Sequence, residues 1–171
     1  LAFVVILATS IISVRSTNAL AESIGLVAHT LEVKDDLTAL QVELGMMEAD
    51  GLRFMIGGTA HHRAGLRTHL GAIGRLLARH QAALQALAAD YAALEIRVQG
   101  SIDIKEAELR NGNADSTAQR LRDGRGENVV DSMREKAFSM SREEDRLLLE
   151  RGLTRDALVK QTTATLMIAN S

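Results

Sequence analysis

Histidines are the side chains of this chain that first suggest metal chemistry. His62 and His69 are seven positions apart, so they share one face of a helix, and His61 lies beside His62. The familiar two-histidine zinc motif spaces its ligands four positions apart, and no Asp or Glu nearby in the sequence completes a ligand set. We therefore interpret His61, His62 and His69 as surface or helix-packing residues, with metal binding as the alternative.

Paired acidic residues are the second feature that could do chemistry, as general acid and base. The pairs are Asp35–Asp36 and Glu143–Glu144. Adjacent helical residues point about 100° apart, so the two carboxylates of a pair do not face each other. We expect both pairs on solvated helix faces. His80 falls on an apolar row, where a hydrogen-bonded histidine is expected and a pH-sensitive contact is the alternative.

The glycine and arginine patterns of this chain indicate helix junctions and ion pairs, not catalytic or phosphate-binding sites. Gly124-Arg125-Gly126 lacks the strand that precedes a phosphate-binding loop, so we interpret it as a helix junction. Asp131 and Arg134 are three positions apart and can form an ion pair on one helix. Four further arginines lie among acidic residues, and we expect a solvated, salt-bridged face: Arg142, Arg146, Arg151 and Arg155. These patterns predict no catalytic residue, no cofactor and no enzymatic activity for this chain.

The composition of the 171 residues predicts an all-α protein that positions these side chains. Ala, Leu, Arg, Glu and Lys make up nearly half of the chain, which has no Pro and only four aromatic residues. The absence of Cys excludes disulfides, cysteine-ligated zinc and thiol catalysis. The formal charge of -2 and the pI of about 6.2 give no electrostatic footprint for nucleic acid, so we expect no nucleic-acid partner.

Two long apolar rows with heptad spacing predict the helices. The first row predicts a helix to about Ile56. Gly57-Gly58 then predicts a helix end, and Thr59 the next N-cap. The second row runs unbroken from Leu66 to Val98, and Asn111-Gly112-Asn113 predicts its end. The first row is Leu26, Thr30, Val33, Leu37, Leu40, Leu44, Met47, Gly51 and Phe54; the second is Leu66, Leu70, Ile73, Leu77, His80, Leu84, Leu87, Tyr91, Leu94 and Val98.

The remaining elements follow from the same signals. A short segment at 114–122 precedes a last helix that starts near Glu127 and continues toward Ile168. If both ends of the domain meet one membrane face, the bundle must be crossed an even number of times. We therefore expect a turn between Arg79 and Gln85, against good local helix propensity. The resulting fold is an all-α, up-down-up-down four-helix bundle with long first and fourth helices.

The first residues suggest a membrane segment. Leu1 to Val14 carry no charge, but as a helix they reach only about 21 Å, short of a complete span. We interpret residues 1–16 as a truncated transmembrane helix. The main alternative is a secretory signal peptide, because Ala19-Leu20-Ala21 forms a small-x-small cleavage site. A buried helix of a soluble protein is the remaining alternative. The first two interpretations place the chain from Glu22 onward outside the cytoplasm.

Three stretches together resemble a known sensory module. They are Glu48-Ala-Asp-Gly-Leu-Arg-Phe-Met-Ile-Gly-Gly58, Gly124-Arg-Gly-Glu-Asn-Val-Val-Asp-Ser-Met-Arg134 and Met140-Ser-Arg-Glu-Glu-Asp-Arg-Leu-Leu148. The pattern is similar to the type-three CHASE domain of bacterial signalling receptors, although Leu52 stands where that family usually has Arg. The resemblance assigns a structural or signalling role to seven matching residues: Glu48, Phe54, Gly58, Asp131, Arg134, Glu143 and Glu144.

The resemblance implies both the domain organisation and the function. Residues 17–152 would be an extracytoplasmic four-helix sensory domain, and residues 153–171 an exit helix toward a second transmembrane segment. The protein would lie in the bacterial inner membrane with this domain in the periplasm or outside the cell. Its output domain is most often a histidine kinase of a two-component system. We expect membrane attachment through the flanking helices, a homodimer, and a small-molecule or protein ligand. The alternative is a structural dimerisation bundle or spacer that senses nothing.

Overall fold

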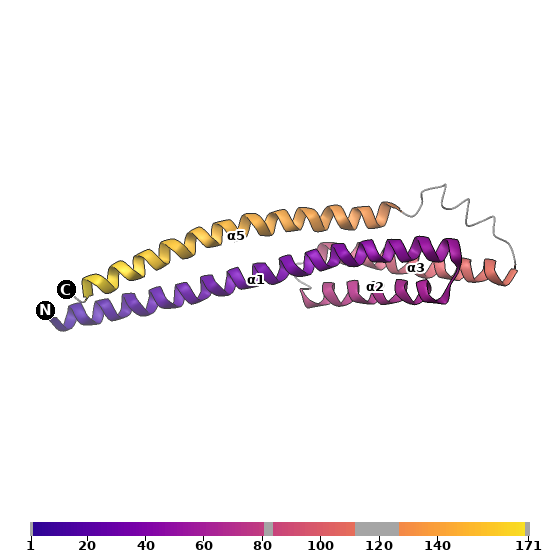
Figure 1. Ribbon diagram of the computed structural model, residues 1–171. Helices are drawn as coiled ribbons and strands as arrows, with labels where there is room; N and C mark the ends of the chain where they lie inside the picture. Colours follow the sequence, from indigo (N-terminus) through magenta and orange to yellow (C-terminus); the bar gives the residue numbers. More distant parts are fainter. Residues whose placement is uncertain (1, 81–83, 112–126, 170–171) are drawn as a thin grey trace. The chain divides into compact units, whose positions relative to one another are not determined.

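The computed structural model describes residues 2–80, 84–111 and 127–169, and nearly all of them are helical (Figure 1). The four helices of this part are α1 (Ala2–Gly57), α2 (Ala60–Arg79), α3 (Gln85–Asn111) and α5 (Glu127–Ala169). No strand occurs among these residues. The predicted all-α fold with long first and last helices is therefore confirmed. The segment predicted at 114–122 lies outside the described residues.

The predicted helix boundaries agree closely with the observed ones. α1 ends at Gly57, and Gly58 has a φ of 64°, in the left-handed region that glycine adopts without strain. Thr59 caps α2, because its hydroxyl accepts a hydrogen bond from the backbone N–H of His62. α2 ends at Arg79 and α3 begins at Gln85, so the chain reverses in the interval that the parity argument predicts.

The chain divides into two compact units, and α1 and α5 contribute to both. The first unit comprises residues up to 34 together with those from 142 on, and the second comprises residues 35–141. In the first unit the start of α1 and the end of α5 run antiparallel (Figure 1). The Ser16 hydroxyl hydrogen-bonds that of Thr162, and Arg151 reaches Thr30.

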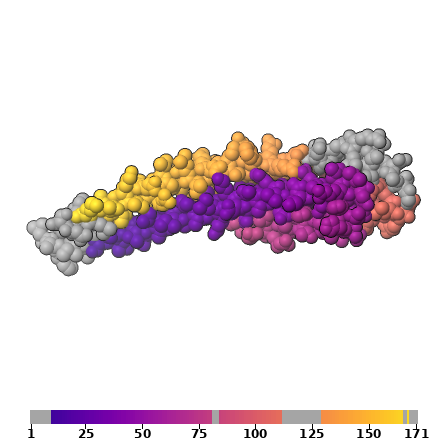
Figure 2. All heavy atoms as spheres, viewed as in Figure 1, coloured from indigo at the N-terminus to yellow at the C-terminus, as the bar shows by residue number. Residues whose placement is uncertain are grey.

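The second unit is an antiparallel four-helix bundle in which an ion pair joins each helix to the next. The four ion pairs are Asp36–Arg79 between α1 and α2 (Nη1–Oδ1 3.0 Å), Arg63–Glu106 between α2 and α3, Asp90–Lys136 between α3 and α5 (Nζ–Oδ2 2.8 Å), and Glu48–Arg134 between α1 and α5. In Figure 2 the α1 atoms of this unit lie at the surface between those of α5 and α2. The four pairs close a ring around the core and favour one helix register.

The core of the second unit is built from the predicted heptad rows. Leu37, Leu40 and Leu44 of α1 have no exposed surface, and neither do Ile73 of α2 and Leu87 of α3. α5 adds Val130, Met133 and Ala137, all buried. Burying apolar surface is the main stabilising term of such a bundle. The predicted row member Leu26 differs, since it is 43% exposed in the first unit, where the described chain is a helix pair.

No helix of the described residues has a stretch long and apolar enough to cross a membrane.

Candidate functional site

Three of the seven residues matched by the resemblance meet on one side of the second unit. Arg134 of α5 donates two hydrogen bonds to Glu48 of α1, one of them from Nη1 to Oε1 at 3.1 Å. The same Nη1 lies 3.7 Å from Oδ1 of Asp131, one turn earlier on α5. The bidentate geometry fixes the register of α5 against α1. The predicted Asp131–Arg134 pair is present, but the closer carboxylate belongs to Glu48.

Phe54 and Gly58 of the same motif have structural roles at the α1–α2 turn. Phe54 is 2% exposed and fills the core at the end of α1. Its carbonyl oxygen accepts a hydrogen bond from the Gly58 N–H at 2.7 Å, which closes the helix end. A Cβ atom on Gly58 would lie 3.0 Å from both terminal methyl groups of Leu109 on α3, so glycine also permits this close approach.

Glu143 and Glu144 lie in the first unit, apart from the other matched residues in the chain's division. Glu143 is exposed and accepts two hydrogen bonds from Arg146, at 3.0 Å from Nε and 2.7 Å from Nη2. These hydrogen bonds hold the pKa of Glu143 below its ordinary value and raise that of Arg146. Glu144 is half-buried. The structure thus places this pair on α5 within the first unit.

A row of histidine–carboxylate contacts lies between α1 and α2, and the sequence interpretation missed it. His62 Nδ1 lies 3.1 Å from Asp50 Oδ1. His69 Nδ1 lies 2.7 Å from Glu43 Oε2, and its Nε2 lies 3.6 Å from Asp50 Oδ2. Gly65 makes room for this carboxylate, because a Cβ there would fall 1.8 Å from Asp50 Oδ2. Histidines at 62 and 69 and acids at 43 and 50 share the same seven-residue spacing, which was the available signal.

The row ends at Asp36, where the expectation of a solvated acidic pair is wrong for one member. Asp36 is only 8% exposed, whereas Asp35 is exposed as expected. Asp36 Oδ1 accepts a hydrogen bond from Arg79 Nη1 at 3.0 Å, and its Oδ2 lies 3.3 Å from His80 Nε2 without hydrogen-bond geometry. A buried carboxylate requires a polar or charged partner, and Arg79 provides one for Asp36. His80 is thus a partly buried histidine at the α2 end, as the sequence predicts.

Within the described residues, no group of three or more His, Asp or Glu side chains is arranged to hold a metal ion. His61 is exposed, and its ring contacts that of His62 edge-on with centroids 5.2 Å apart. The contacts between α1 and α2 are therefore pairwise, between one imidazole and one or two carboxylates. Gly124-Arg125-Gly126, interpreted from the sequence as a helix junction, lies outside the described residues.

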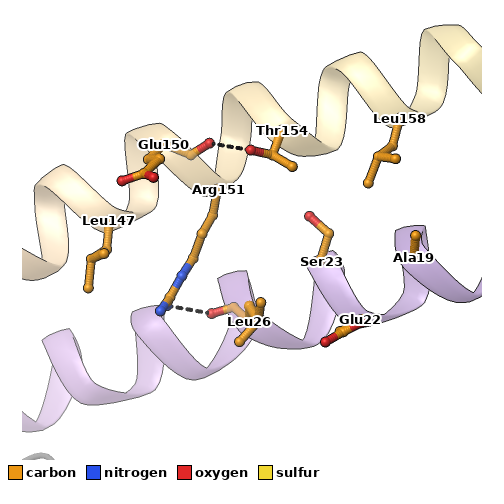
Figure 3. Close-up of a pocket in the computed structure, with 9 residues that line it drawn as sticks. All are labelled: Ala19, Glu22, Ser23, Leu26, Leu147, Glu150, Arg151, Thr154 and Leu158. Carbon is orange, nitrogen blue, oxygen red and sulfur yellow. Dashed lines mark hydrogen bonds between the residues drawn. The ribbon is translucent and has the colours of Figure 1, made fainter.

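An open groove of about 300 Å³ lies between α1 and α5 in the first unit (Figure 3). Arg151 extends from α5 across the groove and donates to the Leu26 carbonyl oxygen at 3.1 Å and to the Thr30 hydroxyl. Ser23 points from α1 toward α5, and Leu158 points back toward α1. The remaining lining residues are Ala19, Glu22, Leu26, Leu147, Glu150 and Thr154. The groove therefore offers a guanidinium, a hydroxyl and apolar walls to a small amphipathic molecule.

The expectation that Arg151 belongs to a solvated, salt-bridged face of the last helix is wrong. Arg146 and Arg155 do pair with acidic residues of α5, as predicted, whereas Arg151 binds α1 instead. The available signal was Thr30, a hydroxyl within an otherwise apolar row. A polar residue at such a position requires a partner when it is buried, and Arg151 provides it.

No family model, curated protein or solved structure matches this chain.

Proposed function

We propose that this chain is the extracytoplasmic signal-input domain of a bacterial transmembrane receptor, with a sensor histidine kinase as the output we favour. The receptor works as a homodimer and responds to a small-molecule or protein ligand. In this proposal the second unit is a firm bundle, and the first unit transmits the signal as a small shift of α5 against α1. The resemblance to the type-three CHASE domain supports the class of receptor, and the contrast between the two units supports the mechanism.

The observation that best supports this mechanism is that the two units are held together by different kinds of contact. In the second unit, apolar side chains from all four helices are buried, among them Leu40, Ile73, Leu94 and Met133 at 0–1% exposure. In the described side chains of the first unit, Val33 is the single buried apolar residue, and the other buried residues there are Ser23 and Thr30. The helix pair is held by polar contacts instead.

These polar contacts favour sliding over a fixed packing. Ser16–Thr162, Thr30–Arg151 and Lys34–Asp145 are among the side-chain pairs that join α1 to α5 in the described part of the first unit. Segments with few buried apolar contacts open and move at lower free energy than packed cores. Helix shifts of about 1–2 Å are a common form of signalling motion, and exchanging one hydrogen-bond partner for another accommodates them.

The early part of α1 and the late part of α5 lie where a membrane receptor requires them. The Ser16–Thr162 contact keeps the early part of α1 beside the late part of α5, so the two helices run to the same end of the first unit (Figure 1). A domain inserted between two membrane spans requires this arrangement. The proposal predicts that Leu1 to Val14 stay uncut and lipid-embedded in cells. N-terminal sequencing that finds Glu22 as the first residue would contradict the membrane anchor and favour a cleaved signal peptide.

A thermal-stability screen tests sensing against the rival structural spacer. The purified chain is heated with sets of amino acids, carboxylic acids and sugars, and the unfolding temperature is measured. A true ligand at 100 times its Kd stabilises the folded state by about 2.7 kcal/mol. Compounds that equally stabilise an unrelated helical bundle are discounted. Stabilisation by one chemical class supports a sensor, whereas no effect from the compounds or from periplasmic extract supports a spacer.

A further inference from the structure

α1 carries a second heptad row that the bundle core does not use. It begins at Val14 and continues in alternating steps of three and four to Ile56. We call it the outer stripe: Val14, Thr17, Ala21, Ile24, Ala28, Leu31, Asp35, Thr38, Val42, Gly45, Ala49, Leu52 and Ile56. The steps hold for six heptads without a break, about 63 Å of helix at 1.5 Å per residue. Heptads sustained over more than three or four repeats are typical of a coiled-coil surface.

The outer stripe is uncovered although it is apolar. Within the first unit, Ile24 is 54% and Leu31 45% exposed. Within the second unit, Leu52 is 51% and Ile56 69% exposed. Every other member is exposed except Gly45, which is half-buried. The outward face of a bundle helix normally carries charged and polar residues, so this row requires another explanation.

The composition of the outer stripe suits close contact between two helices. The small residues Ala21, Ala28, Gly45 and Ala49 are interspersed among larger members, and Asp35 is the single charged residue of the row. Small residues let two backbones approach, and the larger ones interdigitate as knobs into holes. Within each unit, the same row on another copy in parallel matches it position for position.

We propose that a second copy of this chain packs in parallel along the outer stripe of α1. This inference rests on the homodimer of the proposed function, and it adds the surface and the orientation. A parallel pair follows because both copies would leave the same membrane face. Glu48 and Arg53 flank the stripe five positions apart, where parallel coiled coils place oppositely charged residues of different chains. Arg53 is 63% exposed on its side chain, and its Nη1 lies 3.8 Å from Asp50 Oδ1 on the same helix. The Glu48 carboxylate already binds Arg134, but its oxygens keep lone pairs that can accept from a second cation.

Asp35 makes the proposed dimer weak and adjustable. In a parallel pair the two Asp35 carboxylates meet within the stripe, and like charges at facing positions oppose association. Anchoring in a membrane raises the effective concentration, so weak affinity is enough for a dimer there. Replacement of Asp35 with leucine should therefore tighten the dimer. The matched control is Glu135→Leu, which adds the same side chain to an exposed position of α5.

Single cysteines test the interface in membranes, and the native chain has no cysteine to interfere. Ala28→Cys on the stripe should form disulfides between chains under mild oxidation. Ala157→Cys, exposed on α5, should form far fewer. Adding Asp35→Leu should increase the yield at position 28. Equal yields at both positions, or a higher yield at position 157, would overturn the proposal.

Sedimentation separates failure of this interface from failure of the dimer itself. In the Asp35→Leu background, in which the dimer is expected to be tight enough to sediment as a dimer, Ile24→Lys should turn the full chain into a monomer. It should do so without unfolding the chain, because Ile24 is already exposed in the single copy. Ile96→Lys is the control, since Ile96 is 75% exposed on α3, away from the stripe. A dimer that Ile24→Lys leaves intact would overturn the stripe but keep the homodimer. A native chain that is monomeric both in solution and in membranes would overturn both.

Discussion

Replacing Gly58 with alanine should lower the free energy of unfolding by about 1–2 kcal/mol. The φ of 64° is strained for any residue that has a Cβ, and this conformation accounts for that magnitude. The new methyl group would also lie 3.0 Å from both terminal methyls of Leu109. Leu109 is 55% exposed, so its side chain can turn away at little further cost.

The matched control is Gly100→Ala, which should act in the opposite direction. Gly100 lies inside α3, and a Cβ there would meet no atom within 4 Å. Alanine is the better helix residue, so this variant should gain about 0.5–1 kcal/mol. Both changes are the same chemical substitution, so their opposite signs report the local environment of each glycine: its backbone conformation and, at Gly58, the nearby Leu109 methyl groups.

Urea unfolding followed by circular dichroism measures both variants, and a third separates the two causes. Gly58→Ala combined with Leu109→Ala removes the close methyl groups and leaves the backbone strain. If strain dominates, the loss from Gly58→Ala stays at about 1–2 kcal/mol when it is measured in the Leu109→Ala background. Gly58→Asn should lose less, because asparagine tolerates the left-handed region. A Gly58→Ala variant as stable as the native chain would refute this reasoning.

Three further predictions concern the bundle. Leu37→Ala should cost about 2–5 kcal/mol in urea unfolding, because Leu37 has no exposed surface, and a loss below about 1 kcal/mol would contradict its core position. A double-mutant cycle of Glu48→Gln and Arg134→Gln should give a coupling energy of about 0.2–1 kcal/mol, because both side chains are about one-third exposed. This coupling should fall in 1 M salt, and a coupling that salt leaves unchanged would contradict a solvent-screened ion pair. Burial, and secondarily the charge of Glu95, raise the pKa of Tyr91, so Tyr91 contributes fully to the free energy of unfolding below pH 10, and this contribution is lost as the pH rises through the folded-state pKa. Tyr91→Phe should therefore remove part of the stability loss that the native chain shows on titration from pH 8 to 11. Identical stability–pH profiles for the variant and the native chain would contradict this prediction.

Local chemistry predicts the helix ends because each end depends on a few adjacent residues. Gly58 and Thr59 stop α1 and start α2 in the manner expected of a left-handed glycine and an N-cap hydroxyl. The observed ends at Asn111 and Glu127 agree with the predicted ones for the same reason. These signals act within one turn of helix, so no tertiary contact is needed to interpret them.

The reversal between α2 and α3 required a global argument. The heptad row passes through it without a break because both helices face one core, and Leu77 and Leu84 on either side of the reversal are both buried. Propensity alone therefore favours one continuous helix. The requirement of an even number of crossings predicts the turn where the structure has it, between Arg79 and Gln85.

Contacts between side chains of different helices could not be predicted from the sequence. Glu48 and Arg134 are 86 positions apart, and their meeting depends on the register of α5 against α1. Asp36 looked solvated beside Asp35, but a rotation of 100° between adjacent residues buries one and exposes the other. Side-chain exposure also distinguishes the outer stripe from the core row, although the spacing of both rows is visible in the sequence.

The central claim is that a ligand shifts α5 against α1 within the first unit. The most direct measurement is the rate of disulfide formation from Ser16→Cys to a cysteine at either Thr162 or Leu158, in the membrane-bound protein. Thr162 is the observed partner of Ser16, and Leu158 lies one turn earlier on α5. We predict that the ratio of the two rates changes when a compound that raises the unfolding temperature is added at saturation. An unchanged ratio with the compound bound would contradict the claim.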